Sequence, residues 1–395
     1  MPSRATSEGC SLSWKDIVDL MDKPSLVRRV PGDQMIRLQV TPVDLGNPAS
    51  AVRFIGKTRY LNGARTVVTH SVDDATEHLT ACLDAMDQYG IKATAFVNTK
   101  SQVMERLWPR LRQAIANGHE IGSHSRRHMC RLPDTSFSCF RILTRYEIEG
   151  SRDDILEHTS QPYVWSWAYP CGHCSGHAFV QRKIARAGYL TARAYPGELQ
   201  GRHLAPGLQT YDTNPYAARY TQVVQNGYTK LVAKKGEVAI AGRNDPGLLN
   251  AKFDEVHAGG GIYSFVSHPQ MLEYGPDGFY ERHLAYIGGR DDVWYVPMGP
   301  LYAYRILAEQ TSVQQLKSRD ALASFCVFTQ LDPKIYNGSI SLEFEVTEPV
   351  RVIGDGRELA EYISRPLDRW DGQYFRRVDG RILLTTPPNT IVEFR

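Results

Sequence analysis

Apolar and polar positions alternate in two patterns along the middle of the chain. Short apolar runs, typical of buried strands, are followed by segments whose apolar residues recur at helical spacing. The predicted strands are residues 65–71, 91–97, 119–123, 164–169, 189–194 and 261–267. The predicted helices are residues 75–89, 104–116, 146–158, 177–187 and 293–308. Strands that alternate with helices in this way predict a parallel β/α architecture, and the number of units favours a barrel over an open sheet.

The pattern changes on both sides of this region. From about residue 321, short β runs separated by Gly, Pro, Asp and Asn predict a small antiparallel β domain. These runs are residues 327–329, 339–346, 350–353 and 382–386. Before the regular pattern begins, the chain is polar and has one predicted strand, at residues 35–40. We therefore predict an N-terminal extension over residues 1–50, a barrel over 51–315 and a β-rich domain over 321–395.

Composition narrows the class of protein. The chain has 395 residues, 42% of them apolar, which is ample for a large core. Its formal net charge of +3 is small, and no dense Lys/Arg tract supports a nucleic-acid or membrane-surface role. No apolar run reaches the length of a membrane span, and the first thirty residues lack the apolar core of a signal peptide. Seven cysteines leave at least one unpaired within the chain, so the cellular compartment stays open.

The candidate chemistry begins with two carboxylates and two histidines. Asp73 and Asp74 follow a predicted strand, and catalytic groups of β/α barrels lie at the C-terminal ends of strands. His124 and His128 follow another predicted strand, and their spacing suits one face of a helical turn. Each feature alone has a simpler explanation, as a helix cap or as a solvated histidine. Together they predict a site in which Asp74, His124 and His128 hold one metal ion and leave coordination positions open, the arrangement of catalytic sites.

Two further segments end predicted strands at the same rim. Residues 168–172 (Ala-Tyr-Pro-Cys-Gly) form a sharp turn at Pro170 and Cys171, whose backbone N–H groups could stabilise an oxyanion. His268 ends another strand and is placed to act as a general acid, although a hydrogen-bonded core histidine is an equal alternative. Arg126 and Arg127, inside the histidine motif, are expected to be scaffolding rather than chemical groups.

The Cys171–Cys174 segment leaves three interpretations open. A redox pair would need a thioredoxin-like strand and helix, and that context is missing. A second zinc site would need a matching pair of ligands, and none is suitably spaced in the sequence. Cys130 and Cys139 are potential disulfide partners for this loop if the protein is exported. A structural role is favoured.

Read in order, these motifs resemble the polysaccharide deacetylase family (carbohydrate esterase family four). The resemblance covers roughly residues 65–310 and rests on residues 71–74, 124–128, 168–172 and 265–269, with weaker support from 188–193 and 292–295. It implies a distorted β/α barrel that is catalytic and binds one divalent metal ion, most naturally zinc, with cobalt or nickel as alternatives. It would also favour a location outside the cytoplasm if a leader has been removed from the chain.

The resemblance also implies a role for each site residue. Asp73 would be the catalytic base, and Asp74, His124 and His128 would bind the metal. His268 would be the acid, and Cys171, after Pro170, would lend its backbone N–H to the oxyanion.

The chain departs from the family's pattern in several of its motifs. Ser71, Val72 and Ala75 flank the aspartates where the family usually has Thr, Phe and Gly. Ala168 stands where an arginine often pairs with the catalytic aspartate, and Arg193 on the next predicted strand is a possible substitute. Asp212 is a weak candidate for the family's fourth motif. Cys171 replaces an aromatic residue that usually lines the site.

The predicted function is the metal-dependent removal of acetyl groups from N-acetylated amino sugars in a poly- or oligosaccharide, the cleavage of a linear amide bond. A bell-shaped pH profile with a carboxylate limb and an imidazole limb is expected. The alternatives are hydrolysis of a small non-sugar amide or cyclic imide, and a non-catalytic carbohydrate-binding protein. Aromatic residues in the predicted barrel loops slightly favour a glycan substrate, because aromatic faces suit sugar rings. These residues are Trp165, Trp167, Tyr169, Tyr211 and Trp294. The sequence does not identify the glycan, the native metal or the oligomeric state.

Overall fold

The computed structural model describes residues 51–130, 134–194, 246–362 and 372–395, and the backbone of residues 222–224. The predicted extension over residues 1–50, with its strand at 35–40, lies outside the described residues, as do Tyr211 and Asp212. Among the described residues, no helix has both the length and the apolar character that a bilayer span requires.

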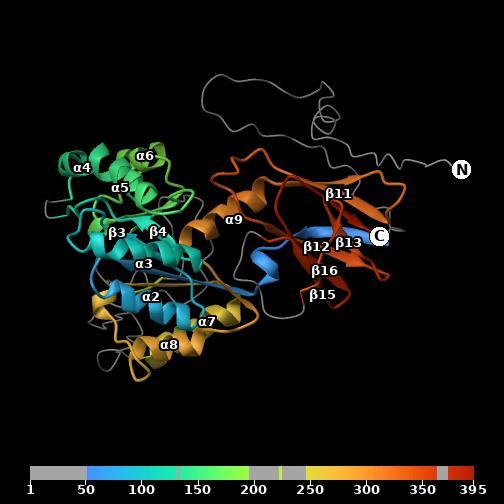
Figure 1. The fold of residues 1–395 in the computed structure, drawn as a ribbon, viewed down its shortest axis with the longest axis horizontal. Helices are drawn as coiled ribbons and strands as arrows, with labels where there is room; N and C mark the ends of the chain where they lie inside the picture. The colour runs from blue at the N-terminus through green and yellow to red at the C-terminus, as the bar shows by residue number, and fades with distance from the viewer. Residues whose placement is uncertain (1–50, 131–133, 195–221, 225–245, 363–371) are drawn as a thin grey trace, which may run out of the picture. The chain divides into compact units, whose positions relative to one another are not determined.

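Parallel strands form the central sheet, in the order β6-β5-β4-β3-β2-β8-β7, with β9 paired to β2 (Figure 1). Every pairing within it is parallel. The sheet is curled into a half-barrel, which confirms the predicted distorted β/α barrel. Its strands are β2 (Thr66–Asp73), β3 (Ala93–Val97), β4 (Glu120–Ser123), β5 (Ser166–Tyr169), β6 (Thr191–Ala194), β7 (Gln222–Val224), β8 (Ile262–Ser267) and β9 (Val293–Tyr295).

Helices connect these strands, as parallel pairing requires. Most agree with the predicted ranges to within a few residues, but α4, α7 and α8 were not predicted. The helices are α2 (Leu79–Gln88), α3 (Met104–Ala116), α4 (Ser136–Ile142), α5 (Arg145–His158), α6 (Ala178–Arg186), α7 (Pro246–Gly259), α8 (Phe279–Ile287) and α9 (Met298–Gln310).

One predicted helix, residues 293–308, was wrong at its beginning. Val293–Tyr295 forms strand β9, whose residues pair with Thr66–Val68 of β2, and helix α9 begins only at Met298. Pro297 precedes that helix and separates the two elements. An apolar run that ends a strand and begins a helix gives no change of periodicity at the boundary, so the pattern did not reveal it.

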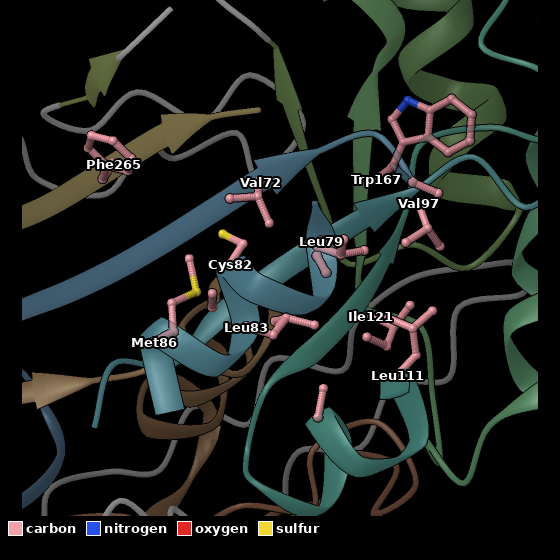
Figure 2. Close-up of a cluster of buried hydrophobic side chains, with 14 of the residues drawn as sticks. Val72, Leu79, Cys82, Leu83, Met86, Val97, Leu111, Ile121, Trp167 and Phe265 are labelled. Atoms are coloured by element: carbon pink, nitrogen blue, oxygen red, sulfur yellow. The ribbon is translucent and has the colours of Figure 1, made fainter. Parts of the chain in front are cut away.

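The main core lies between the parallel sheet and the helices that cover it. Figure 2 shows Leu79, Cys82, Leu83 and Met86 of α2 against Val72 of β2, with other strands and α3 contributing around them. The labelled α2 residues have no exposed surface. Their spacing is the helical pattern that predicted this segment, and their burial fixes which face of α2 meets the sheet.

Two antiparallel sheets make up the C-terminal part, as predicted. One has the order β1-β12-β16-β15, with β1 (Val52–Lys57), β12 (Ile340–Val346), β16 (Arg381–Thr386) and β15 (Tyr374–Val378). The other has the order β10-β11-β17-β13-β14, with β10 (Ser312–Leu316), β11 (Ala323–Phe328), β17 (Thr390–Phe394), β13 (Val352–Gly354) and β14 (Arg357–Glu358). Strand β1 pairs with β12 although it precedes the barrel in sequence. The domain limits at residues 51–315 and 321–395 stay a prediction.

Helix α9 is anchored to the barrel by a buried carboxylate. Glu120, at the start of β4, accepts hydrogen bonds from the Thr94 hydroxyl and the Gly299 backbone N–H, each at 2.8 Å. Burial raises the pKa of the Glu120 carboxyl, because a charge is costly without water around it. A Cβ added at Gly299 would collide with Glu120 and with Trp165. Glycine therefore allows this close approach of helix and strand.

We predict that Gly299→Ala lowers the free energy of unfolding by about 1–3 kcal/mol, because neither Glu120 nor Trp165 can move aside without losing its packing. Chemical denaturation followed by circular dichroism measures the change. Gly56→Ala is the matched control, since no heavy atom lies within 4 Å of the added Cβ. An equal effect of the two substitutions would contradict the proposed close packing.

Candidate active site

The two adjacent aspartates point in different directions because the backbone turns between them. Asp73 is the last residue of β2 and is 1% exposed. Asp74 has a φ of 75°, its N–H bonds to the carbonyl of Phe96, and the next N–H bonds to the side chain of Asn98. Asx residues tolerate this left-handed conformation better than most side chains. The turn leaves Asp73 inside the sheet and brings the Asp74 carboxylate to its rim.

The histidine segment is an irregular loop, so the expected helical turn at residues 124–128 was wrong. Ser125 and His128 have φ values of 65° and 54°, and the His128 N–H bonds to the Ser125 hydroxyl at 2.9 Å. This geometry still brings the two imidazoles together, with 3.1 Å between the Nε2 atoms of His124 and His128. The tight loop therefore places both histidines on one side, as the helical turn was expected to do.

The predicted metal ligands converge on one point. Asp74 Oδ1 lies 3.5 Å from His128 Nε2 and 3.8 Å from His124 Nε2, and the three donor atoms lie within 4.8 Å of one another. His124 Nδ1 is 2.9 Å from the carbonyl oxygen of Ala168. A carbonyl only accepts, so Nδ1 carries the proton and the Nε2 lone pair faces the other donors. Burial lowers the pKa of His124 to about 4, which keeps the ring neutral at neutral pH. Two imidazole nitrogens and a carboxylate form a donor set that fits a divalent transition metal.

Helix α5 holds the histidine loop through two carboxylates that the sequence reasoning missed. Asp154 receives a bidentate pair of bonds from Arg126, at 2.6 and 2.8 Å. Glu147, which is fully buried, accepts the backbone N–H groups of Arg126 and Arg127 at 3.0 Å each, and the Arg127 side chain at 2.5 Å. Gly150 lets the Arg126 guanidinium lie against the helix, because a Cβ there would meet it at 2.6 Å. The two arginines are scaffolding, as expected. Acidic residues on an amphipathic helix give no sequence signal for this contact.

Arg193 contacts Asp73, as the sequence suggested it could. Its guanidinium donates to Asp73 Oδ1, and each side chain is 1% exposed. Arg193 on β6 is the register partner of Ala168 on β5. Ala168 stands where the family often has an arginine, so Arg193 lies directly beside that position in the sheet. The guanidinium also lies 5.0 Å from the centroid of the Phe96 ring. Burial alone would raise the pKa of Asp73, but the charges of Arg193, His124 and His268, together with the hydrogen bond from Arg193, lower that pKa below its usual value.

His268 and the Pro170–Cys171 turn lie at the same rim. Ser267 of β8 is the register partner of Val72 of β2. The residues that follow them, His268 and Asp73, are therefore at the same level of the two parallel strands. His268 Nε2 is 3.8 Å from Asp74 Oδ2. Cys171 has a φ of 57° in a single 3-10 turn that begins at Pro170, directly after β5.

Four cysteines join the segment between β4 and α5 to the residues that follow β5. Cys130 is bridged to Cys171 with 6.3 Å between Cα atoms, and Cys139 to Cys174 with 5.7 Å. This is the pairing that the sequence left as one of three alternatives. The Cys130 sulfur is 4.0 Å from His128 Nδ1, so the first bridge lies next to a predicted metal ligand.

The aromatic residues expected to favour a glycan do not form an exposed surface. Trp165, Trp167, Tyr169 and Trp294 are all at most 5% exposed. They fill the core, so they no longer support a sugar substrate over other substrates.

The ion pair predicts a shift in the titration of Asp73. In Arg193→Met, burial remains while the opposing charge is lost, so the pKa of Asp73 rises and the carboxylate protonates at higher pH than in the unmodified protein. Carbon-13 NMR of aspartate-labelled protein measures it, with Asp73→Asn identifying the signal. Arg193→Lys keeps the charge and should give an intermediate value. An unchanged pKa in Arg193→Met would show that the pair does not control this group.

Comparison with known proteins bears on the barrel. Residues 61–191 match the profile of the polysaccharide deacetylase family. No curated protein matches the chain. Among solved structures, the chain is similar to a putative polysaccharide deacetylase from Mycobacterium smegmatis, with 15% identity, a TM-score of 0.45, and coverage of 68% of this chain and 99% of that one. It is also similar to a probable polysaccharide deacetylase from Pseudomonas aeruginosa PAO1 (14%, 0.43, 66% and 97%) and to Puue allantoinase (14%, 0.43, 67% and 96%).

The matched range spans β2 to the start of β6 and includes four of the predicted site residues, Asp73, Asp74, His124 and His128. Arg193 and His268 follow it in the sequence and reach the same rim through strands of the same sheet. Residues 61–191 therefore match a polysaccharide deacetylase domain, and they supply most of one side of the curled parallel sheet.

Proposed function

We propose that this protein is a metal-dependent hydrolase that removes acetyl groups from N-acetylated amino sugars of a poly- or oligosaccharide. The observation that carries the proposal is the convergence of Asp74, His124 and His128 beside the buried carboxylate of Asp73, inside a polysaccharide deacetylase domain. Three donors in that arrangement leave coordination positions for water and substrate. A divalent ion held there, zinc in the first instance, would lower the pKa of a water molecule and polarise the acyl oxygen.

Each remaining residue has a defined task in this reaction. Asp73, kept ionised by Arg193, accepts a proton from the attacking water. The Cys171 N–H donates to the oxygen of the scissile carbonyl as negative charge develops on it. His268 donates a proton to the departing amine, and acetate and a free amino group are released. The substrate must approach the rim of the sheet, where all of these groups lie.

Asp73→Asn tests the assignment of the base. The amide cannot take the proton, so acetate release from N-acetylglucosamine oligomers should fall by about 100-fold or more. Bound metal, measured by elemental analysis, should stay unchanged because Asp73 is not one of the proposed ligands. Asp84→Asn, at a largely exposed carboxylate on α2, is the matched control and should keep full activity. Full activity in Asp73→Asn would overturn the proposed base.

Removal of the metal tests the cofactor. A chelator should abolish acetate release, and added zinc or cobalt should restore it in the unmodified protein. His124→Ala should lose both metal and activity, and added zinc should not restore them. Turnover that survives complete metal removal would contradict the proposal.

The same assays separate the alternative functions. Turnover of small amides or cyclic imides without release from any glycan would assign the protein to that substrate class. Metal binding without turnover of either kind would leave a carbohydrate-binding protein.

A further inference from the structure

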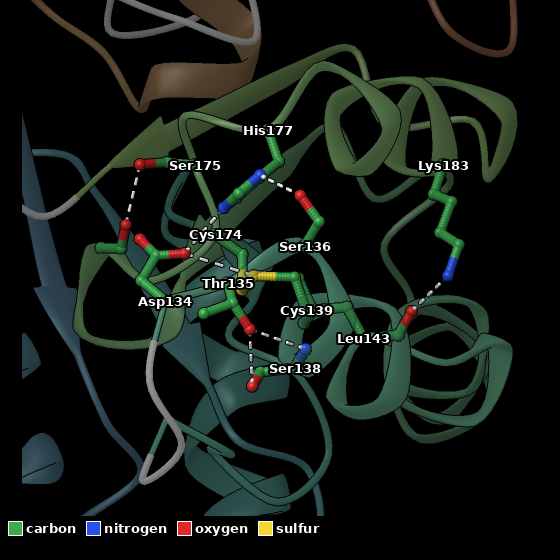
Figure 3. The surroundings of a disulfide bond; sticks show 11 residues. Asp134, Thr135, Ser136, Ser138, Cys139, Leu143, Cys174, Ser175, His177 and Lys183 are labelled. Carbon is green, nitrogen blue, oxygen red and sulfur yellow. Dashed lines mark hydrogen bonds and ion pairs between the residues drawn. A yellow bond between two sulfur atoms is a disulfide. The ribbon is translucent and has the colours of Figure 1, made fainter.

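A second group of potential metal ligands lies beside the candidate active site and takes no part in the proposed reaction. It consists of Asp134, Cys139, His173 and Cys174, whose donor atoms lie within 4.8 Å of one another. Figure 3 shows Asp134 beside the bridge between Cys139 of helix α4 and Cys174, which follows β5. Asp134 Oδ1 is 3.3 Å from the Cys139 sulfur, and both cysteines are fully buried. The sequence offered no suitably spaced pair of ligands to match the segment of His173 and Cys174, and the fold supplies Asp134 and Cys139.

Two features around the group fit a metal site: a hydrogen-bonded carboxylate and a buried imidazole nitrogen. His177 Nε2 lies 3.0 Å from Asp134 Oδ1, and its Nδ1 lies 3.3 Å from the Ser136 hydroxyl. Carboxylates that bind a metal are commonly held in position by a further hydrogen bond, and His177 supplies one to Asp134. His173 Nε2 is buried and has no hydrogen-bond partner among the residues that the structure describes. Such an atom is costly unless something binds it.

We propose that Asp134, Cys139, His173 and Cys174 form a further metal site for zinc or another thiophilic divalent ion, which forms when the Cys139–Cys174 disulfide is reduced. The site and the disulfide are alternative states of one sulfur pair. Two thiolates, one imidazole and one carboxylate are a donor set that zinc binds tetrahedrally.

The conversion balances with a dithiol as reductant. The dithiol gives its two hydrogen atoms to the protein sulfurs and becomes a disulfide, while the Cys139–Cys174 bond breaks. Binding of the metal then releases the two thiol protons to solvent. A low-molecular-weight disulfide reverses the conversion by thiol–disulfide exchange: it takes up the two electrons and two protons from solvent, becomes two thiols, and the ion is released as the Cys139–Cys174 bond forms again.

Contacts other than the disulfide keep the ligands close in the reduced state. The Lys183 ammonium, on α6, donates to the carbonyl of Leu143, at the end of α4, at 3.2 Å (Figure 3). The His177–Asp134 contact joins the same two regions of the chain. Tetrahedral zinc places its ligand atoms roughly 3.3–3.8 Å apart, as follows from bond lengths of about 2.0–2.3 Å. The donors already lie within 4.8 Å, so reduction requires only local movement.

Cobalt titration tests the proposal, because a thiolate bound to cobalt gives a sulfur-to-metal charge-transfer band that the histidine and carboxylate ligands at the candidate active site cannot give. The full chain carrying His124→Ala, which removes that other site, is reduced without oxygen by a phosphine. The phosphine takes up the oxygen of a water molecule and becomes its oxide. We expect about one equivalent of cobalt with the band in reduced protein and no band in oxidised protein.

Two pairs of variants identify the ligands. The Cys139→Ser, Cys174→Ser double variant should lose the band, whereas Cys130→Ser, Cys171→Ser should keep it, which also tests the neighbouring group of His128, Cys130 and Cys171. His173→Ala should weaken cobalt binding at least tenfold. Circular dichroism confirms that each reduced protein is folded. Absence of the band in folded, reduced protein, or its persistence without Cys139 and Cys174, overturns the proposal. Because the readout is spectroscopic, failure of the proposed deacetylase activity would leave this result unaffected.

Discussion

The buried ion pair between Arg193 and Asp73 is the interaction on which the interior of the barrel depends. The two residues come from β6 and β2, which lie several strands apart in the sheet order, so their contact joins two sides of the curled sheet. Each charge is removed from water, and neither would be tolerated there without the other. The pair also contributes to the lowered pKa of Asp73, the residue that we propose as the base. Ala168 has only a methyl group beside Arg193, so the missing arginine of the family's motif is replaced from the adjacent strand.

The histidine loop depends on a different kind of support. Its backbone is irregular and has two residues with positive φ, although the carbonyls of Ser125 and Arg126 accept hydrogen bonds from the backbone N–H groups of Thr99 and Lys100. The carboxylates of Glu147 and Asp154 on α5 bind its N–H groups and its arginine. His124 is in turn oriented by the carbonyl of Ala168. Helix α5 and strand β5 therefore set the directions of the imidazoles before any ion is bound, which reduces the cost of forming a metal site.

The cysteines connect this site to its surroundings. One disulfide joins the loop after β4 to the turn after β5, beside His128, and the other joins helix α4 to the residues after that turn, within the proposed further metal site. The loop that carries a predicted metal ligand and the turn that carries the predicted oxyanion donor are thus held together covalently. A reducing environment would release this connection and, on our proposal, replace one bridge by an ion. The oxidation state of four sulfurs and the geometry of the candidate active site are linked through Cys130 and Cys171.

Sequence patterns alone determined the parallel β/α architecture, the antiparallel C-terminal strands and the four residues Asp73, Asp74, His124 and His128. They could do so because burial imposes a period on strands and helices, and because barrel chemistry collects at the ends of strands. Periodicity failed where a strand passes directly into a helix, at Val293–Gln310. Only the tertiary structure decided how the loops bend, which cysteines pair, and that Glu147 and Asp154 support the histidine loop. Those contacts join residues far apart in sequence, and nothing in the local pattern of a helix or strand records which distant group its polar side chains will meet.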